Sequence, residues 1–285
     1  MYDTLTAVEK TYTPIHLHDH HSNINMVEVV TKFEQYVERA IELGLPTIVC
    51  TNHGVLTGWY NRKKLLESKN MKYVHAVEAY VTWDLENKAR DNFHLSLFAK
   101  NFEGFKELNK LVSNSFNRSD NHFYYNPRIA WKDIKNTSDN ILVSTACLGS
   151  FIWKLKDDDE KYAEILQWID NNKHRVFLEV QPHRHLEQAK LNRHLINLAR
   201  NNGWRIIAGG DVHALNKEHD EARKILQKSK RVEFADEDSF DLTLKSYDEI
   251  FEQFQAQGVL TGDEIAEALN NTNVLLDMVE PFKLD

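Results

Sequence analysis

The chain has 285 residues, of which 42% are hydrophobic, 27% are charged and 5 are proline, a composition that excludes disordered, collagen-like and low-complexity proteins. The formal net charge is -8, so the surface as a whole is not that of a basic nucleic-acid-binding module. Any nucleic acid would have to be held locally, for example by metal ions, which make an acidic ligand cluster electropositive.

Cysteine content and hydropathy set further limits. The two cysteines, Cys50 and Cys147, cannot form a disulfide framework, and the first residues lack the apolar core of a secretory signal. The longest apolar runs are too short to cross a bilayer. We therefore expect a cytoplasmic protein with no role in a membrane.

Strand-like runs alternate with helix-like runs along the chain. The strand-like runs are residues 13–18, 46–51, 72–83, 93–100, 140–145, 175–181 and 204–209. Helical periodicity is clearest over residues 27–43, 103–112 and 185–202. The alternation predicts a largely parallel sheet, open or closed into a barrel, with function at the carboxyl ends of its strands.

No linker divides the chain, so we expect a single α/β unit over residues 1–230. Residues 113–127 are polar and aromatic and are typical of a long excursion from the scaffold. The last part of the chain is charged and helical over residues 246–255 and 261–278, with Thr261 as the expected cap. Residues 231–285 are therefore predicted to form a helical extension packed on the main unit.

Histidine is unusually frequent, with 14 in the chain and four of them between residues 16 and 21. An extended strand would place His16, His18 and His20 on one face, because side chains alternate with period two. These imidazoles could then converge on one point. A histidine-rich surface loop explains this segment alone equally well.

Ligand-type residues recur at the other predicted strands, namely His53, Glu78, His94, Cys147, Asp211 and His213. Imidazole, carboxylate and thiolate are the ligands of zinc and of related manganese or iron sites. A mixed oxygen and nitrogen shell suits hydrolytic metals more than structural ones. The recurrence therefore predicts a catalytic metal cluster.

Short motifs run through nearly the whole chain: His16-Leu17-His18-Asp19-His20, Thr51-Asn52-His53-Gly54, Glu78-Ala79-Tyr80-Val81, His94-Leu95-Ser96-Leu97-Phe98-Ala99-Lys100-Asn101, Phe123-Tyr124-Tyr125-Asn126-Pro127-Arg128-Ile129, Ser144-Thr145-Ala146-Cys147-Leu148-Gly149, Phe177-Leu178-Glu179-Val180, Gly210-Asp211-Val212-His213-Ala214 and Asn271-Thr272. Each is weak alone. Together they resemble the polymerase and histidinol phosphatase (PHP) domain, specifically that at the N-terminus of bacterial DNA polymerase III alpha subunits.

The resemblance implies a distorted seven-stranded β/α (TIM-like) barrel with a cluster of two or three divalent metals, zinc, manganese or iron. The implied ligands are His18, His20, Glu28, His53, Glu78, His94, Cys147, Asp211 and His213. Glu28 aligns best with an acidic ligand of the family, and Asn25 is the alternative if the gap is misplaced. The residues expected to serve catalysis directly are His18, His20, His53, Asp211 and His213.

The sequence departs from the family pattern at Asn52, where the family usually has an aspartate, and this could weaken the orientation of His53. The family does not generally use His16 as a ligand, so we expect it to support a ligand or to pack. The other histidines outside the motifs, His183 and His185 among them, are expected to be surface or locally hydrogen-bonded residues.

Three residues are candidates for substrate contact. His21 adjoins the predicted cluster, while Tyr125 and Arg128 offer an aromatic face for a base and a cation for a phosphate. Packing of the aromatic residues on the barrel rim is the slightly favoured alternative. The basic run at residues 223–231 could contact a nucleic-acid backbone, although a solvated helix face explains it about as well.

A cluster of this kind is suited to phosphoester hydrolysis, and no Walker loop or dinucleotide fingerprint competes with that interpretation. The resemblance narrows the prediction to a 3′ to 5′ exonuclease acting on a single-stranded or frayed DNA 3′ end, without polymerase activity of its own. The alternatives are a phosphatase for small phosphomonoesters and a non-catalytic scaffold or partner for a replicative polymerase. A stand-alone protein and a domain of a longer polymerase both fit the sequence.

Overall fold

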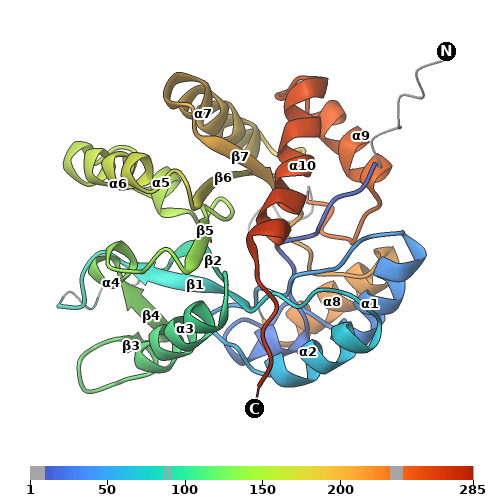
Figure 1. The fold of residues 1–285 in the computed structure, drawn as a ribbon, viewed down its shortest axis with the longest axis horizontal. Helices are drawn as coiled ribbons and strands as arrows, with labels where there is room; N and C mark the ends of the chain where they lie inside the picture. The colour runs from blue at the N-terminus through green and yellow to red at the C-terminus, as the bar shows by residue number, and fades with distance from the viewer. Residues whose placement is uncertain (1–9, 87, 89–90, 232–239, 285) are drawn as a thin grey trace.

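The structure, a computed structural model, describes residues 10–86, 88, 91–231 and 240–284. Its centre is a mixed sheet in the order β3-β4-β1-β2-β5-β6-β7 (Figure 1). The strands are β1 (Ala76–Thr82), β2 (Phe93–Ala99), β3 (Phe123–Tyr124), β4 (Asn126–Ala130), β5 (Ile141–Ser144), β6 (Val176–Val180) and β7 (Arg205–Ala208). The α/β class is therefore confirmed, but within the described residues the strand ladder is not closed.

Strand direction differs from the predicted parallel arrangement at β2, and the short β3, which was not predicted, also pairs antiparallel with β4. β1 and β4, β5 and β6, and β6 and β7 pair in parallel, as expected. β2 runs antiparallel to both of its neighbours, β1 and β5. Only residues 83–92 connect β1 to β2, which is too short for the crossover of a dozen or more residues that a parallel pair needs.

The first two predicted strands are extended segments rather than ladder strands. Leu17 forms an isolated bridge with Val212, just after β7, and the Leu17 carbonyl accepts a hydrogen bond from the Thr51 amide at 2.7 Å. The Thr51 carbonyl in turn accepts from the Glu78 amide of β1 at 3.1 Å. These segments thus lie between β7 and β1, but the Leu17 amide donates to the Thr51 side chain instead of a carbonyl, which interrupts regular pairing. The predicted seven-stranded barrel is not confirmed.

The helices are η1 (His20–Ile24, a 3-10 helix), α1 (Phe33–Glu42), α2 (Trp59–Ser68), α3 (Phe102–Ser115), α4 (Trp131–Lys135), α5 (Phe151–Lys154), α6 (Asp159–Asn171), α7 (Leu186–Asn202), α8 (Lys217–Ser229), α9 (Tyr247–Gln257) and α10 (Gly262–Met278). The predicted helices correspond to α1, α3, α7, α9 and α10. α1 begins six residues later than the periodicity indicated, because the amides of Glu28 and Val29 donate to the side chain of Asn23 instead of starting a helix.

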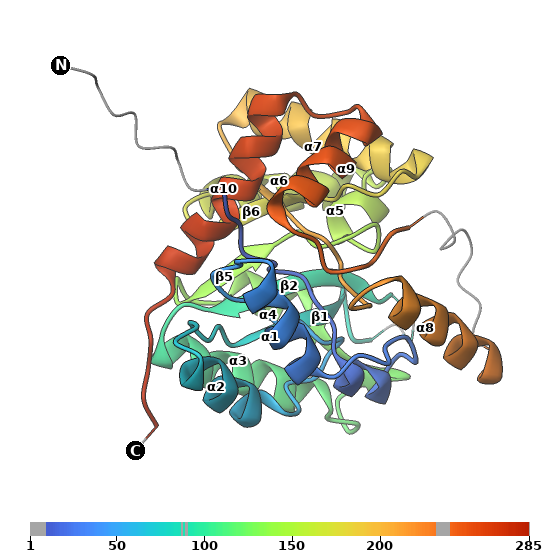
Figure 2. The same cartoon turned by 90° about the vertical axis from the view of Figure 1, so that its right-hand side faces the viewer.

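The C-terminal helices pack against the end of the sheet. In Figure 2, α7, α9 and α10 gather on one side of the molecule and α1, α2 and α3 on the other. α10 contacts β7, where Asn271 donates to the Ile206 carbonyl at 2.7 Å, and Thr272 accepts from the Thr13 amide at 2.8 Å. The predicted cap is confirmed, because Thr261 accepts from the Glu264 amide in a capping box. The proposed boundary at residue 230 borders residues 232–239, which lie outside the described residues.

No helix in the described part of the chain is both long enough and apolar enough to cross a membrane.

Candidate metal centre

The extended segment at residues 15–18 delivers two histidines to the interior. The His18 amide donates to the Val212 carbonyl at 2.8 Å, and the Val212 amide donates to the His16 carbonyl at 3.0 Å. These bonds hold the segment beside the chain that follows β7, and both imidazoles are fully buried. At Asp19 the chain turns into η1, so the period-two alternation ends before His20.

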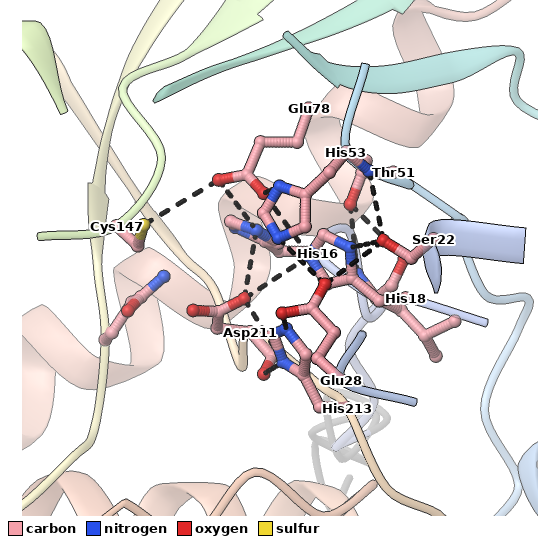
Figure 3. Close-up of polar contacts among 12 residues, drawn as sticks. His16, His18, Ser22, Glu28, Thr51, His53, Glu78, Cys147, Asp211 and His213 are labelled. Carbon is pink, nitrogen blue, oxygen red and sulfur yellow. Dashed lines mark hydrogen bonds and ion pairs between the residues drawn. The ribbon is translucent and has the colours of Figure 1, made fainter. Parts of the chain in front are cut away.

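Carboxylates from three separate segments lie among the imidazoles (Figure 3). His18 Nε2 lies 3.4 Å from both Glu78 Oε2 and Asp211 Oδ1. His53 Nε2 lies 3.0 Å from Glu28 Oε1, and its Nδ1 lies 2.8 Å from Glu78 Oε2. Residues that are remote in sequence therefore form one continuous cluster.

Further donors extend the cluster on two sides. His213 Nε2 lies 3.2 Å from Glu28 Oε2. On the side of β2, His94 Nδ1 lies 2.9 Å from Glu78 Oε1 and 3.3 Å from Cys147 Sγ. The side chain of Glu78, at the centre of β1, thus connects the imidazoles of His18 and His53 with the His94 and Cys147 pair.

His16 also belongs to the cluster. Its Nε2 lies 3.2 Å from Asp211 Oδ1 and 3.4 Å from Glu78 Oε1, while its Nδ1 lies 2.7 Å from Glu179 Oε1. A carboxylate on one imidazole nitrogen orients the ring and raises the basicity of the other nitrogen, the usual arrangement behind a metal-binding histidine. The sequence expectation ranked His16 as a supporting residue, whereas the structure aims it at the same point as His18.

Glu179 supports the cluster through its contact with His16, a role that the sequence did not predict although the residue lies in one of the motifs. It is fully buried in β6 and also accepts hydrogen bonds from Ser144 and Gln181. The signal in the sequence was a carboxylate at the middle of an otherwise apolar strand. Gly209 leaves room for it, since a Cβ at that position would lie 1.9 Å from Glu179 Oε1.

The donor atoms of the cluster fit divalent metal ions. Five buried atoms that face one another make no hydrogen bond with the described residues: His16 Nε2, His18 Nε2, His53 Nδ1, Glu78 Oε2 and Asp211 Oδ1. They lie within ion-pair distance of one another, but buried polar atoms that make no hydrogen bond are costly unless another partner satisfies them. Nitrogen, carboxylate oxygen and thiol sulfur are together the ligands of zinc and of related transition metals.

The buried charges shift the pKa values of these groups. Burial opposes protonation of His16, but the surrounding carboxylates, Glu179 foremost, outweigh it and hold the pKa of His16 well above its usual value. Burial and the neighbouring imidazoles of His213 and His53 lower the pKa of His18 to about 4. Burial raises the pKa of Glu28, but His53 and His213 outweigh this effect and hold it well below its usual value. At neutral pH the cluster therefore contains ionised carboxylates and at least one neutral imidazole.

His20 was expected to be a ligand, but the structure does not bring it to this cluster. It lies in η1, where its ring is tilted against that of His21 at 4.1 Å between centroids, and its possible ligand partners are Asp19 and His21. The groups that affect its pKa are burial, His21, Asp19, Glu34 and Lys32, none of which belongs to the cluster. Glu28, by contrast, is placed inside the cluster, and the alternative Asn25 donates to the His53 carbonyl instead.

Asn52 does not act on the imidazole of His53. Its Nδ2 donates to Asp19 Oδ1 at 2.7 Å, and its Oδ1 accepts from the Asp19 amide at 2.9 Å. Asp19 is further held by Arg62 at 2.9 Å and by His21 Nδ1 at 3.1 Å. The hydrogen bonds of Asn52 therefore hold the chain where it turns away from His18, and the expected weakening of His53 orientation finds no support.

Of the predicted substrate contacts, Tyr125 is exposed and Arg128 is buried. Tyr125 is 61% exposed at the turn between β3 and β4, with a positive φ of 62°. Arg128 is fully buried, and its guanidinium donates to the carbonyls of Asn121 and His122 while covering the ring of Tyr124. The prediction that Arg128 holds a phosphate is wrong, because its charge is used to tie down the loop before the hairpin.

A cavity of ≈ 340 Å³ opens beside the cluster. Glu28, His53, His94, Cys147, Asp211 and His213 line it together with Met26, Leu148, Gln181, Gln188, Phe240 and Leu242. These six candidate ligands are therefore accessible to a small molecule, whereas His16, His18 and Glu78 are fully buried.

A protein-family model described as the PHP domain matches residues 16–183. The DNA polymerase III subunit alpha of Borreliella burgdorferi is 29% identical over 287 residues, which cover 95% of this chain and 24% of that protein. The corresponding subunit of Aquifex aeolicus is 30% identical, over 74% of this chain and 19% of that protein. The chain thus spans about a quarter or less of the length of these relatives.

Among solved structures, a Bifidobacterium adolescentis protein provisionally described as a metal-dependent phosphoesterase covers 85% of this chain and 96% of its own. The TM-score is 0.45 and the sequence identity is 15%, a likeness too low to support an argument.

Proposed function

The chain belongs to the PHP domain family, and from that premise we propose that it is a metal-dependent phosphoesterase, specifically a 3′ to 5′ DNA exonuclease. The observation that carries the proposal is the convergence of imidazole, carboxylate and thiol donors with buried atoms that lack hydrogen-bond partners. Homology to polymerase III alpha subunits supports a setting in DNA replication, with a polymerase subunit as partner.

Nine residues would hold the ions: His16, His18, Glu28, His53, Glu78, His94, Cys147, Asp211 and His213. His16 takes the place that the sequence prediction gave to His20. The carboxylates of Glu28 and Glu78 each lie within ion-pair distance of two or more imidazoles, so each would help those imidazoles to hold the ions.

Divalent ions bound there would lower the pKa of a water molecule toward about 7 and neutralise charge on a phosphate. The protein itself orients the imidazole rings that would bind the ions. Glu179 fixes the ring of His16, and Glu78 fixes His53 and His94 from the opposite side of the cluster. Of the predicted catalytic residues, His53, Asp211 and His213 line the cavity and are expected to face the reacting phosphate, whereas His18 is fully buried and would only hold an ion.

Recognition of DNA would be local. The net charge of -8 makes long-range attraction of DNA weak, so binding should depend on the loaded cluster and on the exposed rim. Tyr125 and His21 remain the proposed substrate contacts, the first as a stacking surface. Sequence selectivity should be low, because contacts to phosphate carry no base information.

The proposal also includes the division of the chain. Residues 1–230 would form the catalytic unit, and residues 231–285 would form a helical extension on it. Asn271 and Thr272 of α10 make the described contacts to β7 and to Thr13.

The decisive experiment combines metal analysis with hydrolysis of single-stranded DNA labelled at its 5′ end. Metal-loaded protein should shorten the strand stepwise, and Asp211→Asn should reduce the rate by at least about 100-fold, since it removes a buried carboxylate while keeping its shape. Asp241→Asn, outside the cluster, is the matched control and should retain activity. Loaded protein that cleaves small phosphomonoesters but never DNA would replace the exonuclease with a phosphatase. Protein that binds metal but hydrolyses neither would point to a scaffold.

A further inference from the structure

The cavity beside the metal centre has apolar lining residues whose presence the binding of a phosphate does not explain. Four of its lining residues are apolar: Met26, Leu148, Phe240 and Leu242. Ions and a phosphate need polar partners, whereas apolar and aromatic walls with a few placed polar groups are typical of sites for organic ligands. The volume of ≈ 340 Å³ lies at the small end of the range of about 300–1,000 Å³ for such sites.

Gln188 places a polar group in the lining of the same cavity. Its side chain is fully buried at the start of α7, and its Oε1 makes no hydrogen bond with the described residues. Its Nε2 donates to Asn192 Oδ1 at 2.9 Å. A buried carbonyl oxygen without a donor carries a desolvation cost, which a ligand N–H group would remove.

The direction of the Gln188 amide is fixed by its neighbours. Asn192 Nδ2 donates to the Gln181 carbonyl at 2.7 Å, and Asn192 Oδ1 accepts from the Gln181 amide at 3.2 Å. Asn192 must therefore present its oxygen to Gln188, which in turn must donate with its nitrogen. The free oxygen of Gln188 is consequently an acceptor that cannot exchange places with the amide nitrogen.

Phe240 provides an aromatic face. It is partly exposed and lines the cavity, and two imidazole rings pack against it, His183 at 4.9 Å between centroids in an edge arrangement and His185 at 5.2 Å in a stacked one. Aromatic side chains are the surfaces on which bases stack in proteins that bind single-stranded nucleic acids. The ring therefore offers a supported surface for a planar ligand.

We propose that this cavity binds one nucleoside, with its base against Phe240 and an N–H group of the base donating to Gln188 Oε1. The inference rests on the proposed function, because it places the attached phosphoryl group at the metal cluster. All four DNA bases carry an N–H donor on their pairing edge, so the site selects a nucleotide over a simple phosphoester without strong preference among bases. Gln188 and Phe240 are positioning residues for the terminal nucleotide.

The test compares two phosphodiesters that differ only in the nucleoside, thymidine 5′-(p-nitrophenyl phosphate) and methyl p-nitrophenyl phosphate. In both, a water oxygen forms a bond to phosphorus while the bond to p-nitrophenolate breaks, and the proton of the water passes to solvent. Wild-type protein loaded with manganese should show a KM at least about 10-fold lower for the thymidine ester. Gln188→Leu and Phe240→Ala should each raise that KM about 10-fold and leave the methyl ester kinetics unchanged. Gln253→Leu, on α9 and lining a different cavity, is the matched control.

The outcomes separate the inference from the proposed function. Equal KM values for the two esters, or equal effects of the variants on both, would overturn the nucleoside site while leaving the phosphoesterase intact. If the wild type hydrolyses neither ester, the proposed function fails. Calorimetric titration of manganese-loaded protein with thymidine 5′-monophosphate then tests the nucleoside site separately. The inference requires that the wild type binds this nucleotide and that Phe240→Ala raises its Kd about 10-fold. Melting curves of each variant identify any loss that comes from unfolding.

Discussion

His16 and His20 lie two residues to either side of His18, and only one of them shares its direction. The carboxylates of Asp211, Glu78 and Glu179 surround His16, whereas the pKa of His20 is lowered by burial and by His21. Alanine substitutions of His16 and His20 remove the same imidazole group at nearby positions, yet they should have different effects on metal affinity.

We predict that His16→Ala lowers the affinity for divalent metal by at least about 10-fold, because it removes a nitrogen from the cluster and takes the imidazole partner away from the buried Glu179. His20→Ala should change it by less than about 2-fold. Elemental analysis after dialysis against a graded series of free metal concentrations measures both. The reverse ranking would restore His20 as a ligand and place His16 among the packing residues.

At the scale of elements, the end of β7 is shaped by a side chain on β6. The Glu179 carboxylate occupies the space beside Gly209, where a Cβ would lie 1.9 Å from Oε1 and 2.4 Å from Cδ. A shift of that carboxylate would also move the ring of His16, which it holds at 2.7 Å. The spacing between two adjacent strands therefore sets the position of a candidate ligand.

We predict that Gly209→Ala destabilises the fold by about 1–3 kcal/mol, the usual cost of overpacking a core, and also weakens metal binding. Gly262→Ala is the control, since a Cβ at the start of α10 would meet nothing within 4 Å. Urea unfolding curves with and without metal compare the two variants. Wild-type stability in Gly209→Ala would show that Glu179 can relocate freely.

The β3–β4 hairpin places its arginine and the tyrosine of its turn in opposite environments. Arg128 is buried and supports the carbonyls of the preceding loop, while Tyr125 projects at the turn. The positive φ of Tyr125 costs roughly 1–2 kcal/mol for a residue other than glycine. The hairpin therefore presents an aromatic side chain at a strained turn and keeps its cation inside.

For the whole molecule, acid stability depends on buried neutral histidines. Burial lowers the pKa of His75 to about 3, and its Nδ1 lies 2.7 Å from the Tyr73 hydroxyl. In the unfolded chain the pKa returns to about 6.5. Between these values only the unfolded state binds the proton, so the contribution of His75 to stability is complete above about pH 6.5 and is lost as the pH falls toward 3.

We predict that His75→Gln makes the free energy of unfolding less dependent on pH between 6.5 and 4. The difference in slope from wild type should approach, but not exceed, about 1.4 kcal/mol per pH unit. His174→Gln is the control, because that residue lies at the surface and contacts Asp139. Parallel slopes for wild type and His75→Gln in metal-free urea titrations would contradict the assignment.

Metal removal should also affect the whole molecule. The cluster joins β1, β2, the end of β7 and the segment at residues 15–18, so an ion bound only in the folded state stabilises contacts across the molecule. At a metal concentration about 100 times the Kd the gain is about 2.7 kcal/mol. We predict that chelation lowers the Tm by roughly 5–10 °C. A Tm that is unchanged by chelation and by readdition of manganese or zinc would mean that the cluster binds no ion.

The sequence alone determined the features that depend on local chemistry. The α/β class, five of the ladder strands, the cap at Thr261 and the resemblance to the PHP family all followed from residue type and spacing. The donor types at the strand ends could be identified in the same way, because metal chemistry restricts ligands to a few side chains.

Only the tertiary structure decided which donors meet. Period-two alternation holds while a strand stays straight, but Asp19, fixed by Asn52 and Arg62, turns the chain before His20. The inward direction of Arg128 and the role of Glu179 likewise depend on contacts between segments far apart in sequence. Sequence spacing sets which side chains can share a face, whereas long-range packing and hydrogen bonding set where that face points.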